Sequence, residues 1–408
     1  MKGLLAMKLE LERQNFLKAW QTAEKFTSTK TPKEATRAIL ITANDDNSVI
    51  IRATNLNTSV KLTAAGVNVL EPGQALIPAA IFGEMLRKSP SEDLVLEVNS
   101  ARGLLNAGTQ KTRFAITPVD EFPNSDDSSG ADKICELLAA ELVTIINEGS
   151  SASSQPQDFP KYLGTCLLRT SDNMLKCVST DGKRLSLSQI PCEVSKDDDF
   201  LLLTPSLRDL SKTLSGCDDD DVVKLLTDGS IVWFALNNAE FSMRRVDSTF
   251  PKFERILNNV TSTTLRINAG DFIKALERVD IIAKTTPAHI MAMSLSPDGE
   301  LKITARAPEA GTTSEVLQTN IDGNPLNVGF NVGYFIDGLK AVGNEQAVIE
   351  FSGDEGQTRL KREGNGNFLY MLMPARLTQQ DLMTTEEIAD FTGKNVEPFE
   401  QENTDNQF

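Results

Sequence analysis

The segment Leu9-Glu10-Leu11-Glu12-Arg13-Gln14-Asn15-Phe16-Leu17-Lys18-Ala19-Trp20 has a counterpart 256 residues later, Leu265-Arg266-Ile267-Asn268-Ala269-Gly270-Asp271-Phe272-Ile273-Lys274-Ala275-Leu276. In both segments the first apolar residues alternate, which predicts a short strand. A helical pattern follows, and we expect Asn15 and Asp271 to be the N-caps, because their side chains can accept from free amides. The chain therefore repeats itself, and the interval is twice 128 residues.

The same interval recurs in two further elements. Phe122 and Phe250 stand 128 residues apart in similar Phe-Pro segments, and the third copy ends in Tyr370-Met371-Leu372-Met373-Pro374. A second helix start is expected at Pro78, Pro205 and Asn331, at intervals of 127 and 126 residues. Three elements with one spacing indicate a three-fold internal repeat.

Each copy is expected to be one α+β domain, with two helices packed on antiparallel sheet and about eight short strands. Strands are expected at 37–42, 48–54 and 59–64 in the first copy, and at 175–179 and 231–236 in the second. We expect domains at residues 1–128, 129–257 and 258–377, and a disordered acidic tail at 378–408. Two such chains can join head to tail into a closed ring with no free sheet edge, whereas three unconnected domains are the simpler alternative.

The composition argues against several function classes. A net charge of −16 opposes nucleic-acid binding, but the tail carries eight acids and one base, so the net charge does not exclude a local basic surface elsewhere. One histidine, His289, and five scattered cysteines without a CxxC pair favour neither catalysis nor a metal site nor disulfides. We expect no catalytic residue, metal or cofactor. Without a membrane span or signal peptide, we expect a cytoplasmic, nucleoid-associated protein that starts at Met1 or Met7.

Four motifs in order resemble one known family. They are Thr180-Asp181-Gly182-Lys183-Arg184-Leu185, Phe250-Pro251-Lys252-Phe253-Glu254-Arg255-Ile256-Leu257, Phe330-Asn331-Val332-Gly333-Tyr334 and Met373-Pro374-Ala375-Arg376-Leu377. Together with the triple repeat, they resemble the bacterial sliding clamp, the beta subunit of DNA polymerase III, over about residues 7 to 377. The resemblance implies a homodimeric six-domain ring that encircles duplex DNA and raises the processivity of the polymerase.

In that family, a groove between the second and third domains binds short peptides of polymerases, clamp loader and repair proteins. The resemblance places this groove at Leu163, Thr180, Gly182, Lys183, Arg184, Leu185, Pro251, Arg255, Ile256, Asn331, Tyr334, Met371, Met373, Pro374, Arg376 and Leu377. Leu, Ile, Met and Pro would form an apolar slot, and Arg184 and Arg376 could fix polar peptide groups. Lys183 and Ala375 depart from the family's usual residues and put the peptide preference in doubt. The simpler interpretation of Thr180–Leu185 is a strand, an Asp-Gly turn and a strand.

Basic residues of the first helices are expected to face the DNA. The candidates are Arg13, Lys18, Lys25, Lys274 and Arg278, and the resemblance adds Lys30 on a loop. Such contacts would reach phosphates only, without base readout. For the dimer interface the resemblance points to Phe114, Ile281 and Ile282, although a buried helix face would also explain the two isoleucines.

Two alternatives stay open at this point. A repeat scaffold could bind peptides without encircling DNA, and a metal-dependent nuclease could use the run Asp218–Asp221, although a solvated acidic loop explains that run. One hypothesis concerns the tail: Gln379-Gln380-Asp381-Leu382-Met383 resembles the clamp-binding pattern of a Gln followed by a Leu-aromatic or Leu-aliphatic pair, and could compete for the groove.

Overall fold

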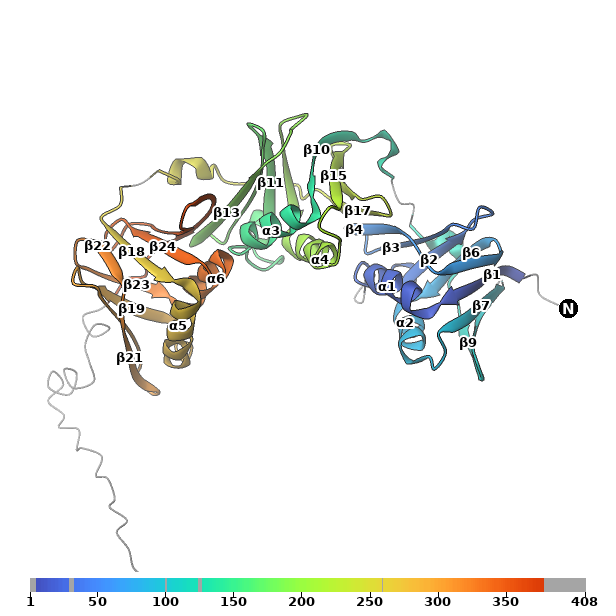
Figure 1. The fold of residues 1–408 in the computed structure, drawn as a ribbon, viewed down its shortest axis with the longest axis horizontal. Coiled ribbons are helices and arrows are strands. Elements are labelled where there is room, and N and C mark those ends of the chain that lie inside the picture. The colour runs from blue at the N-terminus through green and yellow to red at the C-terminus, as the bar shows by residue number, and fades with distance from the viewer. Residues whose placement is uncertain (1–4, 29–32, 100, 124–126, 259, 378–408) are drawn as a thin grey trace, which may run out of the picture. The chain divides into compact units, whose positions relative to one another are not determined.

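The computed structural model describes residues 5–28, 33–99, 101–123, 127–258 and 260–377 (Figure 1). Lys30, the tail from 378 onward and the hypothesis on residues 379–383 lie outside the described residues. The chain divides into two compact units: the first holds residues up to Val178 and Gln189–Phe250, and the second holds Ser179–Ser188 and the residues from Pro251. Among the described helices, none is long and apolar enough to span a membrane.

The first copy of the repeat lies in the first unit and has nine strands and two α-helices within its described residues. The helices are α1 (Arg13–Glu24) and α2 (Ala79–Lys88). The strands are β1 (Leu5–Glu12), β2 (Ala38–Ala43), β3 (Val49–Thr54), β4 (Thr58–Thr63), β5 (Val67–Glu71), β6 (Gly73–Pro78), β7 (Asp93–Asn99), β8 (Arg102–Ala107) and β9 (Gln110–Ala115).

The second copy repeats the plan with α3 (Ala139–Gly149) and α4 (Thr204–Leu214). Its strands β12 and β13 begin in one unit and end in the other. The strands are β10 (Asp132–Leu138), β11 (Thr165–Ser171), β12 (Met174–Thr180), β13 (Arg184–Pro191), β14 (Asp198–Leu203), β15 (Val222–Thr227), β16 (Ile231–Ala235) and β17 (Ala239–Arg244).

The third copy lies in the second unit, with α5 (Ala269–Ala283) and α6 (Val332–Val342) side by side (Figure 1). A short 3-10 helix, η5 (Phe253–Ile256), precedes it. Its strands are β18 (Thr263–Asn268), β19 (Ile290–Leu295), β20 (Glu300–Ala307), β21 (Gly311–Gln318), β22 (Asn320–Gly323), β23 (Leu326–Asn331), β24 (Gln346–Phe351), β25 (Thr358–Arg362) and β26 (Asn365–Leu372).

The helix starts test the predicted caps. Asn331 caps α6, because its side chain accepts a hydrogen bond from Tyr334 N at 3.0 Å, and Pro78 and Pro205 stand at the starts of α2 and α4. The caps predicted at Asn15 and Asp271 were wrong, because both helices begin earlier. α1 starts at Arg13, and Asn268 caps α5 by accepting from Asp271 N at 3.0 Å. In both copies the strand continues closer to the start of the helix than the spacing of the apolar residues suggested.

One antiparallel sheet connects the first and second copies within the first unit. Its strand order is β10-β15-β16-β17-β4-β3-β2-β6, and the copies meet where β17 pairs with β4. We call this pairing the first joint. In it Ser242 lies opposite Ser59 and Phe241 lies opposite Val60. The sheet edges of the two copies therefore satisfy each other, as the repeat predicted.

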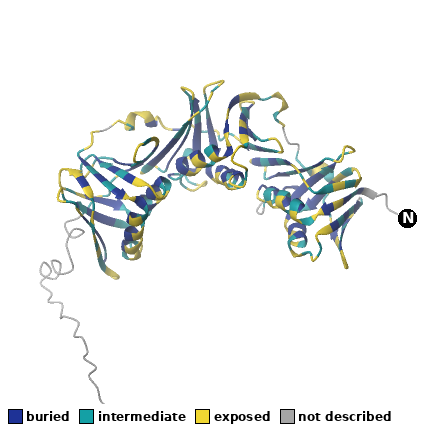
Figure 2. Cartoon of the chain, viewed as in Figure 1, coloured by how far each residue is buried: buried dark blue, intermediate teal, exposed yellow. Residues whose placement is uncertain are grey.

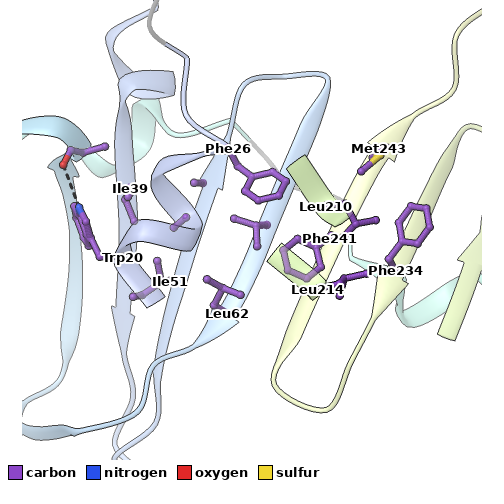
Figure 3. Close-up of a cluster of buried hydrophobic side chains, with 14 of the residues drawn as sticks. Trp20, Phe26, Ile39, Ile51, Leu62, Leu210, Leu214, Phe234, Phe241 and Met243 are labelled. Atoms are coloured by element: carbon purple, nitrogen blue, oxygen red, sulfur yellow. Dashed lines mark hydrogen bonds between the residues drawn. The ribbon is translucent and has the colours of Figure 1, made fainter. Parts of the chain in front are cut away.

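A shared apolar core backs this joint. Phe26 of the first copy packs against Phe241 of the second, with ring centroids 5.4 Å apart (Figure 3). Leu62, Leu210 and Leu214 lie in the same cluster of buried side chains. Burial is concentrated in the strands and in the inner faces of the helices (Figure 2). All five cysteines are free thiols, and three of them are buried.

In the second unit, strands β13, β26, β25, β24, β18 and β22 are neighbours in that order. Here β13 pairs with β26, so that Leu185 lies opposite Met371 and Ser186 opposite Tyr370. We call this pairing, over Arg184–Ser188, the second joint. It uses the same strand positions as the first joint, with β13 in place of β4 and β26 in place of β17.

Candidate partner-binding site

The turn before β13 is fixed by the side chains of Thr180 and Asp181. Thr180 Oγ1 donates to Arg184 O at 2.6 Å, and Asp181 Oδ1 accepts from the backbone N–H groups of Lys183 and Arg184 at 2.9 and 3.0 Å. Gly182 has a φ of +87°, a conformation that a residue with a Cβ adopts only under strain. The predicted Asp-Gly turn is thus correct, and it presents Lys183 to solvent.

Arg184 is held entirely by its own unit. Its Nε donates to Asp181 Oδ2 at 2.8 Å, and its Nη1 donates to Asp337 Oδ2 at 2.7 Å and to Tyr370 Oη at 2.9 Å. The guanidinium also lies 4.1 Å from the centre of the Tyr334 ring. Burial opposes the charge, but the Tyr370 hydroxyl and the two carboxylates outweigh it and raise the pKa of Arg184.

These contacts give Arg184 a positioning role. Tyr370 Oη in turn donates to Tyr334 O at 2.9 Å, so Arg184 connects the turn, β26 and α6. Burial raises the pKa of Tyr370, although Arg184 opposes that effect. The direct contact between Arg184 and a peptide that the sequence suggested stays a prediction.

The opposite face of the second joint carries apolar side chains. Tyr370 faces α6, where a Cβ on Gly338 would lie 2.5 Å from its ring, so the alternation of the strand directs Met371 and Met373 to the other face. Leu185 shares that face with Met371. Met373 is 54% exposed, and its backbone N–H donates to Lys183 O at 2.9 Å. This face therefore combines buried apolar walls with an exposed methionine.

A pocket adjoins the end of β26. It has a volume of about 690 Å³ and is lined by Asn327, Val328, Gly329, Asp354, Glu355, Pro374, Ala375, Arg376 and Leu377. Ala375 N donates to Gly329 O at 2.8 Å, and a Cβ on Gly329 would lie 2.6 Å from Leu377 Cδ2, so only glycine permits this close approach. The predicted groove residues Pro374, Arg376 and Leu377 thus line one cavity.

Other predicted groove residues have separate positions. Asn331 caps α6 beside Tyr334, and Ile256 O accepts from Gln357 Nε2 at 2.8 Å, which holds η5 near the start of β25. Pro251 and Arg255 are exposed in the same connecting segment. Leu163 belongs to the first unit, where its carbonyl accepts from Ser154 N at 2.8 Å, so its place in the groove stays a prediction.

Comparisons with known proteins agree with this architecture. Models of the N-terminal, central and C-terminal domains of the DNA polymerase III beta subunit match residues 7–126, 136–252 and 254–376. The chain belongs to the DNA polymerase III beta subunit family.

Several beta subunits are similar over nearly the whole chain. The beta sliding clamp of Staphylococcus aureus is 25% identical over 380 residues, which cover 91% of this chain and 99% of that protein. The Pseudomonas putida clamp is 27% identical over 75% of this chain and 83% of its own length. The crystal structure of the Bacillus subtilis sliding clamp has a similar fold, with a TM-score of 0.85 at 21% identity, covering 91% of this chain and all of that one. A Pseudomonas aeruginosa clamp bound to griselimycin has a TM-score of 0.83 at 23% identity, with the same coverage.

The predicted DNA-facing residues differ in their contacts. Lys18 and Lys25 are exposed and form no ion pair with any described residue. Arg13 pairs with Glu92, Lys274 with Asp271 at 3.2 Å, and Arg278 with both carboxylate oxygens of Glu315 at 2.6 and 3.0 Å. Lys18 and Lys274 each stand at the sixth position of their helices.

The predicted interface residues also differ in their exposure to solvent. Ile281 is 58% exposed and Ile282 half-buried, whereas Phe114 is buried against Phe82, with ring centroids 5.4 Å apart. An apolar pocket of about 490 Å³ lies where α2 and β9 meet, and it is lined by Ala80, Ile81, Glu84, Met85, Lys88, Gln110 and Thr112. The sequence did not predict this pocket, because no local motif corresponds to it.

Proposed function

We propose that this protein is a replication processivity factor: a homodimeric ring that encircles duplex DNA in the cytoplasm and tethers DNA polymerase and other partners. The observation that carries the proposal is the match of all three family domains, in order, to the three copies of the repeat. The fold supports it, because the copies continue each other's sheets at both joints.

Two free sheet edges support closure into a ring. β9 ends one sheet of the first unit and β21 ends one sheet of the second. β9 presents exposed Lys111 and Arg113, whereas the region of β21 and α5 presents Glu277 and the exposed apolar side chains Ile281 and Val316. We propose that β9 of one subunit pairs with β21 of its partner, and that the apolar pocket beside α2 receives Ile281.

The proposed role needs no catalytic residue. Among the described residues, no group of three or more His, Cys, Asp or Glu side chains could hold a metal ion. In the run Asp218–Asp221, Asp218 N donates to Asp221 Oδ2 at 2.9 Å, which closes an acidic turn. We propose an accessory subunit that acts by topology and by recruitment.

Retention on DNA tests the proposal against a peptide-binding scaffold that does not encircle DNA. After loading by a clamp loader onto nicked circular DNA, the protein should remain bound through gel filtration in moderate salt. It should be lost once the circle is linearised, because a ring slides off a free end. Equal retention, or equal loss, on both forms would contradict the ring.

A charge variant complements that experiment. Lys18→Ala should weaken direct binding to duplex DNA most at low salt, because one phosphate contact that releases counterions is lost, whereas Arg278→Ala should weaken it less, because Arg278 is already paired with Glu315. Equal effects of the two variants would contradict this ordering.

A further inference from the structure

Arg359 in β25 is a buried arginine whose charge has no partner among the residues that the structure describes. Its residue is 8% exposed, and its Nε and Nη2 are buried without a hydrogen bond to any described residue. A buried charge without hydrogen bonds is costly, and such groups in folded proteins are usually paired. Arg359 therefore calls for a counter-charge that the described residues of the second unit do not supply.

The strand register places Arg359 on the face of the second joint that carries Met371 and Leu185. Arg359 lies directly opposite Met371 on β26, and Met371 lies directly opposite Leu185 on β13. Residues opposite each other on antiparallel strands share a face. Gln357, two residues before Arg359, reaches η5 through Ile256 O at 2.8 Å. Arg359 thus belongs to the face that carries Leu185 and Met371, which the family resemblance predicts to bind partner peptides.

The nearest acidic residue by register is already engaged. Glu350 on β24 lies opposite Arg359, but its Oε2 accepts from Lys361 Nζ at 2.7 Å. Elsewhere in the chain, arginines use the same Nε and Nη2 edge to hold both oxygens of a carboxylate. Arg169 holds Asp199 at 2.6 and 2.7 Å, and Arg278 holds Glu315 at 2.6 and 3.0 Å. The Nε and Nη2 edge of Arg359, which is buried and makes no hydrogen bond to a described residue, could form such a two-point contact.

The equivalent position of the first joint carries no charge. Trp233 lies opposite Ser242 on β17, as Arg359 lies opposite Met371 on β26. The Trp233 indole N–H is also buried and unpartnered, but it is neutral, so its burial costs much less than that of a guanidinium. The charge is therefore specific to the second joint.

We propose that Arg359 is a specificity-determining residue of the peptide-binding face, and that its Nε and Nη2 bind the carboxylate of an Asp or Glu in the partner peptide. The inference rests on the proposed function, because it assumes that this face receives peptides. Because both nitrogens are covered, the Arg359 side chain or the segment that covers it moves when the peptide binds.

The test uses the full-length protein and fluorescein-labelled peptides Ala-Gln-Leu-Ala-Leu-Phe-Ala, blocked at both ends. One alanine at a time is replaced by Asp or by its neutral isostere Asn, and binding is measured by fluorescence anisotropy. At one position the Asp peptide should bind roughly tenfold tighter than the Asn peptide, as expected for a charge-assisted contact. Arg359→Gln should abolish that preference, so that the Asp and Asn peptides bind with equal affinity.

Two variants control for charge and for folding. Arg169→Gln removes the same charge far from the face in sequence and should retain the Asp preference. Arg359→Lys keeps the charge without the two-point edge and should retain only part of it. Thermal melting of each variant verifies that it is folded.

The outcomes separate this inference from the function on which it rests. No Asp preference at any position, a preference that survives in Arg359→Gln, or an equal loss for the Asp and Asn peptides would overturn the role of Arg359. The last result would mean that Arg359 only supports the fold. If no peptide binds to the unmodified protein, the proposed peptide-binding face fails, and this inference fails with it.

Discussion

The two joints share one backbone register and differ in chemistry. Ser59 and Ser242 face each other in the first joint where Leu185 and Met371 face each other in the second. On the other side of the sheet, Phe241 packs on Phe26 in the first joint, whereas its equivalent Tyr370 bonds Arg184 in the second. The first joint thus has an apolar core and a serine pair on its outer face, whereas the second has an apolar pair on its outer face and the polar Arg184–Tyr370 contact on its inner side.

The segments that follow each sheet fit this difference. At the first joint, Phe122 and Asp127 close a cavity of only about 50 Å³ over Ser59 and Ser242, and Ser128 Oγ donates to Glu240. At the second joint, Met373 and Ile256 remain exposed near the equivalent face. A repeated domain can therefore build one joint for stability and leave the other open for binding.

The largest expected difference is in the loss of stability caused by substituting Arg184 and by substituting Thr58. Both residues begin their joint strands, but Thr58 forms none of the four contacts that Arg184 makes. Arg184→Met should destabilise the second unit by ~3 kcal/mol, because it leaves buried polar partners unpaired. Thr58→Val should cost the first unit less than ~1 kcal/mol. Hydrogen exchange of β26 and β17 measures both, and equal losses would break the comparison.

Exchange of the facing pair tests the binding difference. The double variant Leu185→Ser, Met371→Ser gives the second joint the serines of the first. It should weaken peptide binding by roughly 30-fold or more, because two apolar anchoring surfaces are lost. Ser59→Ala with Ser242→Ala is the matched control, for which we expect unchanged affinity in calorimetric titration. A comparable loss in the control would mean that the second joint is not the binding face.

Tyr370 gives the second joint a pH dependence that Phe241 cannot give the first. Burial raises the pKa of Tyr370 above its ordinary value of 10, so the folded state retains a proton that the unfolded state loses. Stability from this group is therefore complete below about pH 10 and falls above it by ~1.4 kcal/mol per pH unit until the folded pKa is reached. Tyr370→Phe should remove this slope. Urea unfolding of both proteins from pH 9 to 11 measures it, and parallel curves would contradict the assignment.

The smallest effect is expected at Ser128. Ser128→Ala removes the contact with Glu240 that holds the connecting segment to the first joint, and it should cost ~1 kcal/mol. Limited proteolysis at residues 119–131 should speed up, while peptide affinity stays constant. A change in peptide affinity would show that the first joint also contributes to binding.

The sequence predicted the repeat well, because the helix starts and strand alternation that define it are local. Pro78, Pro205 and Asn331 stand where the second helices begin, and the strands near 49–54 and 231–235 lie within a residue of their predicted bounds. The N-caps of α1 and α5 were each predicted three residues too late, because the strand runs directly into the helix.

The site was predicted less completely, because its chemistry depends on register between distant strands. The motifs pointed to Arg184, Tyr334 and Met371, yet nothing local showed that Asp337 and Tyr370 would hold Arg184. Arg359 belongs to no motif at all and shows its role only through its unpartnered nitrogens opposite Met371. Phe114 is buried by packing within the first copy, and its place in the dimer interface stays a prediction.

Sedimentation equilibrium of the full-length protein tests the central claim most directly. A head-to-tail ring predicts a particle of twice the chain mass of 44.6 kDa across micromolar concentrations. Ile281→Asp should shift that particle toward monomer, because a charge would enter the apolar pocket beside α2. A chain that stays monomeric at every concentration would contradict the ring and, with it, the proposed function.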